Sequence, residues 1–255
     1  MNPESSLQLT TESYVEHLLA DAERFATVLD GTPLDTPVPT CPGWDISRLA
    51  QHTGQIHRWA NFCASHGRAA SADEAAALES YDPTIAGEWF RDGAAALADT
   101  LRSLDPAAPT WHPFPVEQVA GFWPRRMAHE SAVHRWDAEV AAGVSAGIDA
   151  AVASDGIDEY FEIVAPRLIA GGRAELPSGT LHVHCTDVPG EWLLSSDAAG
   201  EYQMIRAHQK GDAALRGPAM PILLKLWGRQ SDGADQLSPI GDESVLDAWL
   251  AIGGV

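Results

Sequence analysis

The chain has 255 residues, 45% of them hydrophobic, which is enough for one large domain or two modest ones with a buried core. It carries 36 acidic against 16 basic residues, a formal net charge of −20. Such a surface repels nucleic-acid phosphates and anionic membrane surfaces, so we expect neither as a partner. Three scattered cysteines exclude a disulfide framework.

The start of the chain is polar and lacks the pattern of a secretory leader, and no apolar run approaches the ~20 residues that a membrane helix needs. We therefore expect a cytoplasmic protein. Lysine occurs only at Lys210 and Lys225, while alanine, glycine and arginine are abundant. This bias is typical of a GC-rich genome.

Apolar residues at steps of three and four predict four helices in the first half of the chain. The second of them begins at Asp45, a suitable N-cap, and its apolar stripe continues to Cys63. The other three are predicted over residues 11–29, 83–104 and 124–142. Helices of this length indicate an antiparallel bundle, whose core is a common place for metal sites.

The second half of the chain mixes helix and strand patterns. Residues 151–170 predict a further helix, and period-two alternation predicts strands over 179–185, around 192–194 and over 202–205. Two shorter helices are predicted over residues 221–229 and 243–252. We expect an α+β fold of two domains, a helical bundle over residues 1–148 and a smaller α+β domain over residues 149–255.

Two predicted helices carry residues that could bind a metal ion. Glu130 and His134 are spaced i, i+4 and therefore share one helix face, while His52 lies beside the apolar stripe of the second helix. Two imidazoles and one carboxylate would form a three-ligand site with an open position, as a catalytic metal requires. Spacing alone leaves His57 and His129 as rival ligands.

Two neighbouring positions refine this metal hypothesis. The pair His129–Glu130 would need a histidine at position 133 to form a zincin motif, and Val133 stands there. Asp137 follows His134 by three residues and could orient its imidazole, although a surface ion pair is the simpler interpretation.

Three segments resemble the mycothiol-dependent maleylpyruvate isomerase family, which belongs to the DinB-like metal-dependent four-helix bundles. The first is VPTCPGWDI at 38–46, which continues to His52 and on to HRWA at 57–60. The second is ESAVHRWDAE at 130–139. The third, GDAALRGP at 211–218 followed by LWGR at 226–229, is similar to the family's sterol-carrier-like C-terminal domain. The resemblance covers nearly the whole chain, in the family's order.

The resemblance implies a site and a cofactor. In the family the metal, usually zinc, is bound by the histidine of the first motif and by the glutamate and histidine of the second, here His52, Glu130 and His134. It also implies mycothiol as the thiol cofactor and a small electrophilic molecule as the substrate. The expected reaction is cis–trans isomerisation of a maleylpyruvate type, or S-transfer to another electrophile.

An anionic substrate would need a cation near the reacting carbon, and the family resemblance implies an arginine from the C-terminal domain. We predict Arg229, with Arg206 and Arg216 as rivals. An arginine at a helix end that complements the helix dipole is an equally simple interpretation of Arg229.

Other interpretations stay open at this point. The scaffold could serve a non-catalytic binding module, or the metal could activate water in a hydrolase that needs no thiol. We interpret Cys41 as structural or incidental, Cys63 as a core residue, and His182 and His184 as exposed strand histidines. Because fold and metal are shared by enzymes with different substrates, the resemblance does not choose among electrophiles.

Overall fold

The computed structural model describes residues 9–253, which divide into two compact units, residues 9–147 and the residues from 148 onward. Each unit has its own elements and its own buried core, and each is described by itself below. Within residues 9–253, none of the helices is both long and apolar enough to cross a membrane.

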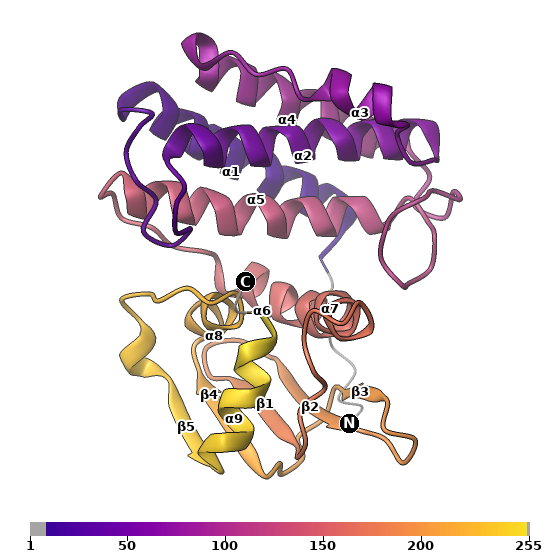
Figure 1. Ribbon diagram of the computed structural model, residues 1–255, viewed down its shortest axis with the longest axis vertical. Coiled ribbons are helices and arrows are strands. Elements are labelled where there is room, and N and C mark those ends of the chain that lie inside the picture. Colours follow the sequence, from indigo (N-terminus) through magenta and orange to yellow (C-terminus); the bar gives the residue numbers. More distant parts are fainter. Residues whose placement is uncertain (1–8, 254–255) are drawn as a thin grey trace. The chain divides into compact units, whose positions relative to one another are not determined.

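The first unit is a bundle of four long helices (Figure 1). These are α1 Thr11–Gly31, α2 Ile46–His66, α4 Ala86–Ser103 and α5 Phe122–Ala141. A short helix, α3 Ala72–Leu78, and a 3-10 turn, Pro83–Ile85, join α2 to α4. Helix α1 packs on α4 and α5, and so does α2, so that α2 and α5 are neighbours in the bundle.

Local sequence explains where these helices begin and end. Thr10 caps α1 by accepting a hydrogen bond from the Ser13 amide, and Asp45 caps α2 in the same way through the Arg48 amide. Gly67 ends α2 in the left-handed conformation, with φ of 66°. The apolar stripes meet inside the bundle, where Phe25 and Phe90 pack with ring centroids 4.5 Å apart.

The second unit contains a five-stranded mixed sheet and helices. Its strands are β1 Leu181–Cys185, β2 Glu191–Ser196, β3 Tyr202–Ile205, β4 Ala213–Gly217 and β5 Ser238–Gly241. Its helices are α6 Ala150–Glu159, α7 Ala165–Ala170, α8 Ala219–Leu226 and α9 Glu243–Leu250, with 3-10 turns at Ala234–Gln236 and Ala251–Gly253. Among the described residues the strand order is β3-β2-β1-β4-β5, and only the β1–β4 pair is parallel.

The two faces of this sheet differ in burial. Alternate residues of β1 (Leu181, Val183 and Cys185) are buried, and helices cover this face. Trp192, paired with Val183, donates a hydrogen bond to Asp158 of α6, and α9 contacts β1, β4 and β5. His182 and His184 therefore lie on the opposite face.

The α+β expectation is confirmed, and the differences from the predicted elements have local causes. The helix predicted over 151–170 contains a π-helical turn, Tyr160–Val164, which ends two residues before Pro166, whose ring nitrogen cannot donate a helical hydrogen bond. The helix predicted to reach Arg229 ends at Leu226, because Gly228 takes a left-handed φ of 74°. Helix α3 and strands β4 and β5 were not predicted.

Candidate metal centre

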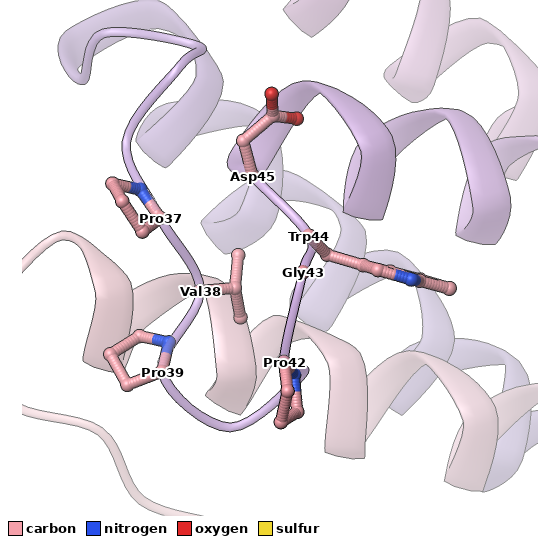
Figure 2. Close-up of a pocket in the computed structure, with 7 residues that line it drawn as sticks. All are labelled: Pro37, Val38, Pro39, Pro42, Gly43, Trp44 and Asp45. Atoms are coloured by element: carbon pink, nitrogen blue, oxygen red, sulfur yellow. The ribbon is translucent and has the colours of Figure 1, made fainter.

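Helix α2 brings His52 to the side of the bundle that faces α5. The loop before α2 folds back on itself along Pro37–Asp45 and lines a surface pocket (Figure 2). From the end of this loop the Trp44 side chain extends along the helix (Figure 2). Its ring meets the His52 ring edge-on, with centroids 4.9 Å apart. This contact limits the orientations that the His52 imidazole can adopt.

Helix α5 supplies the other two residues from consecutive turns, as the i, i+4 spacing predicts. Glu130 Oε1 lies 3.3 Å from His134 Nε2 and 3.6 Å from His52 Nε2. The two imidazole rings are perpendicular, with centroids 5.2 Å apart. One donor atom from each of His52, Glu130 and His134 therefore lies within 4.8 Å of the other two.

Two further side chains fix the remaining atoms of this cluster. Arg126, one turn before Glu130, donates to Glu130 Oε2 at 2.5 Å. Asp137 Oδ2 lies 3.0 Å from His134 Nδ1 and its side chain is fully buried, so the imidazole donates Nδ1–H to this carboxylate. Glu130 Oε1 and His134 Nε2 are thereby the atoms directed to the centre of the cluster.

Electrostatics make this centre a site that is suited to a cation. Burial would raise the pKa of Glu130, but the charges of His134 and Arg126 outweigh it and hold that pKa well below its ordinary value. Burial would lower the pKa of His134, but the carboxylates of Glu130 and Asp137 raise it to about 9. The carboxylates of Glu130 and Asp137 thus stabilise the proton that gives His134 its positive charge. A divalent cation would displace this one proton on binding.

The rival histidines lie outside this cluster. His57 is fully buried, and its Nε2 lies 2.9 Å from the Ser131 hydroxyl. Desolvation lowers the pKa of His57 to about 4, so the residue is a neutral core histidine. His129 is also buried and packs edge-on against Tyr14, with ring centroids 6.1 Å apart. Neither residue belongs to a group of converging ligand atoms within the described residues.

Cys41 approaches the site from the loop that precedes α2. Its thiol lies 3.5 Å from Asp137 Oδ2, and Cys41, His134 and Asp137 form a second small group of possible ligand atoms. That group uses the opposite nitrogen of His134, because Nδ1 faces Asp137 and Nε2 faces Glu130. The thiol thus contacts the residue that orients His134.

The donor set fits a divalent transition metal. Two imidazole nitrogens and one carboxylate oxygen are ligands that zinc accepts, and three protein ligands leave a fourth position open. The side chain of His52 is 34% exposed, whereas those of Glu130 and His134 are 14% and 13% exposed. The cluster is therefore accessible from the His52 side.

Arg126 was not singled out from the sequence, although a signal was present. Arg126, Glu130 and His134 follow one another at steps of four, which places all three on one face of α5. An i, i+4 arginine–glutamate pair is so common on solvated helices that the spacing alone does not mark it as part of a site. Here its burial distinguishes it, because the Arg126 side chain is only 7% exposed.

The three candidate arginines of the second unit have different surroundings. Arg206 forms a two-pronged ion pair with Asp158, with distances of 2.6 and 2.7 Å, and also lies 3.4 Å from Glu162. Arg216 is exposed on the sheet face that carries His184. Arg229 follows α8 and donates to the Trp227 carbonyl at 2.8 Å, a contact typical of an arginine at a helix C-terminus.

Comparison with known proteins identifies both units. Residues 15–139 match the family profile described as the mycothiol maleylpyruvate isomerase N-terminal domain, and residues 151–248 match the C-terminal domain of the same family. A search of curated proteins found none that matches.

Two solved structures have a similar fold. One is a mycothiol-dependent maleylpyruvate isomerase, with a TM-score of 0.59 and 14% identity over 91% of this chain and 93% of the other. The second is a histidine-to-alanine mutant of such an enzyme, with a TM-score of 0.57 and 13% identity at the same coverage. Both domain profiles match in order and together span most of the chain, and the chain therefore belongs to the mycothiol maleylpyruvate isomerase family.

Proposed function

We propose that this protein is a metal- and thiol-dependent enzyme that uses mycothiol to isomerise a small cis-enedione of the maleylpyruvate type, or to transfer the thiol to a related electrophile. Membership of an isomerase family supports the enzyme class. The observation that carries the proposal is the convergence of His52 Nε2, Glu130 Oε1 and His134 Nε2 at a partly exposed position of the bundle.

These residues have separate tasks in the proposed site. The cation would be held by His52, Glu130 and His134, and zinc is the first cation to test. Its positive charge would lower the pKa of a thiol at the open position. Arg126 holds Glu130 in its ionised form, and Asp137 keeps the proton of His134 on Nδ1 so that Nε2 can bind. Residues 1–148 are the proposed metal-binding domain, and residues 149–255 are the proposed C-terminal domain.

The proposed reaction balances without an oxidant or reductant. The thiolate sulfur adds to one carbon of the cis double bond, and the electron pair of that bond moves to the neighbouring carbonyl as an enolate. The resulting carbon–carbon single bond rotates, and the enolate then reforms the double bond in the trans arrangement and expels the thiolate. In S-transfer the adduct is protonated and released instead.

The test uses the full chain loaded with zinc, incubated with mycothiol and maleylpyruvate and then with other electrophiles, with products followed by mass. We expect conversion that needs both metal and mycothiol and is lost in His134→Ala, while the control His66→Asn, at an exposed position, keeps it. Turnover without mycothiol would instead indicate a hydrolase. A loaded protein that converts no electrophile would indicate a binding module.

Arg229 is the proposed cation for the substrate. Its place in the LWGR segment supports this choice, and Arg206 and Arg216 remain its rivals. We expect Arg229→Ala to lower kcat/KM by about 100-fold, the usual cost of removing one charge-stabilising donor. The metal content and the circular dichroism spectrum should stay unchanged. Arg216→Ala is the matched control, and an equal loss in both variants would contradict the assignment.

A further inference from the structure

A second cluster of metal-binding side chains lies in the second unit, apart from the site described above. His182, His184, Glu191 and His208 each offer one ligand atom, and these four atoms all lie within 4.8 Å of one another. The sequence predicted only two exposed strand histidines here. The fold adds a third imidazole and a carboxylate.

Three segments of the chain build this cluster. His182 and His184 alternate along β1 and share the sheet face opposite the helices. Glu191 begins β2 and is paired with His184 in the antiparallel register, which places both side chains next to each other on that face. His208 comes from the loop between β3 and β4.

Glu191 lies among the three imidazoles. Its Oε2 is 2.7 Å from His208 Nδ1 and 3.9 Å from His182 Nε2, and its Oε1 is in close contact with His184 Nδ1. The rings of His182 and His208 are perpendicular, with centroids 5.5 Å apart. For comparison, ligand atoms held about 2.1 Å from zinc in a tetrahedral site lie roughly 3.4 Å apart.

Two of these imidazole nitrogens lack a hydrogen-bond partner although they are buried. They are Nε2 of His182 and Nδ1 of His184, and the latter contacts Glu191 without the geometry of a hydrogen bond. Buried polar atoms are normally satisfied, so each such atom requires an explanation. A ligand between them would supply the missing interaction.

The composition of the cluster favours a cation as that ligand. Neutral imidazole is the commonest metal ligand in proteins, and three imidazoles converge here with one carboxylate. Within the four-residue cluster Glu191 supplies one negative charge to offset part of the cation's charge.

We propose that His182, His184, Glu191 and His208 form a second divalent-metal site, for zinc or a related transition metal. Four protein ligands close the coordination sphere of zinc, which is the pattern of a structural site and not of a catalytic one. Such an ion would tie the β1–β2 hairpin to the loop before β4, and so stabilise the second unit without taking part in turnover.

Zinc binding to the untagged full-length chain tests this proposal. The chain is stripped of metal and titrated with zinc in competition with a chromophoric chelator, in a His134→Ala background that removes the first site. We expect one zinc per chain in this background. Adding His208→Asn should weaken that binding by about tenfold or more, and adding His182→Asn as well should abolish it.

The matched control is His66→Asn in the same background, because His66 is also an exposed histidine but lies outside every cluster of ligand atoms among the described residues. His208 is 81% exposed, so His208→Asn should preserve the fold, which circular dichroism checks. Equal zinc binding by His134→Ala/His182→Asn/His208→Asn and by His134→Ala/His66→Asn would overturn the proposal.

Cobalt supplies a readout that does not depend on stoichiometry. Bound in place of zinc, Co²⁺ in the His134→Ala chain should show the strong visible bands of a four-coordinate ion, and His208→Asn should weaken them. An unchanged spectrum would contradict the assignment of His208. If wild type and His134→Ala bind zinc equally, only the proposed first site fails, so the two proposals are distinguished.

Discussion

At the scale of single residues, Asp137 determines which nitrogen of His134 can bind a metal. Its buried carboxylate accepts from Nδ1–H at 3.0 Å, which leaves Nε2 beside Glu130. We expect Asp137→Asn to lower zinc affinity about 10–100-fold, the usual effect of losing such a partner. Competitive zinc titration measures it, with the exposed Asp99→Asn on α4 as the control. Equal affinities would show that Asp137 has no such role.

His57 gives the metal-free protein a specific dependence on pH. It is neutral in the folded state with a pKa of about 4, against about 6.5 when unfolded, because burial disfavours its charged form. The unfolded chain therefore binds more protons between these values, and stability falls as the pH drops from 6.5 to 4. Over the whole transition, this proton binding lowers the free energy of unfolding by about 3 kcal/mol.

The measurement is denaturant unfolding of the wild type and of His57→Gln across this pH range. We expect His57→Gln to lose less free energy of unfolding on acidification than the wild type does, whatever its stability at pH 7. Parallel curves would show that His57 does not carry this proton linkage.

The candidate ligands could be predicted from the sequence, and their partners only in part. His52, Glu130 and His134 are on helices, where fixed spacing relates position in the chain to position in space. The preference for His52 over His57 came from the family resemblance. The structure adds a physical reason, since His57 is buried against Ser131. The His208 cluster could not be predicted, because a loop and a strand register bring it together.

At the scale of elements, helices α2 and α4 approach closely at Gly54. A Cβ built on Gly54 would lie 2.1 Å from the Trp89 ring. That ring has little room to move, because it stacks on the Arg58 guanidinium at 3.7 Å and donates to the Ser80 carbonyl at 3.0 Å. A methyl group at this position would have to displace a ring that is held on two sides.

We therefore expect Gly54→Ala to lower the free energy of unfolding by about 1–3 kcal/mol, the usual cost of overpacking, despite alanine's better helix propensity. Gly31→Ala at the end of α1 is the control, because a Cβ there meets nothing within 4 Å, and it should be neutral or slightly stabilising. Denaturant unfolding measures both variants. Equal stability of the two would show that Trp89 can move aside.

The elements that were predicted and those that were missed differ in the strength of their local signals. The long bundle helices have apolar stripes that extend over four or more turns and are easily recognised. Strand β4 contains Ala213 and Ala214, which have low strand propensity, and the edge strand β5 contains Pro239 and Gly241. Pairing of β4 with β1 supplies the order that its own sequence does not indicate.

At the scale of the whole molecule, the net charge of −20 acts on every ligand that approaches. It attracts divalent cations and repels anions, and the range of this field is set by ionic strength, about 30 Å at 0.01 M and about 10 Å at 0.1 M. A carboxylate-bearing electrophile of the proposed kind must approach against this field. This long-range repulsion is therefore set by the total charge of the protein and not by any single residue.

We expect kcat/KM for a carboxylate-bearing electrophile to rise as salt increases from about 0.01 M to 0.1 M, because screening weakens the repulsion that slows encounter. An uncharged electrophile, measured with the same zinc-loaded enzyme and the same mycothiol, is the control and should change little. Steady-state kinetics at fixed pH gives both values. If kcat/KM for the anionic substrate instead falls with salt, a local positive field, such as that of Arg229, outweighs the total charge at the place where the substrate enters, and Arg229→Ala should then remove this salt dependence.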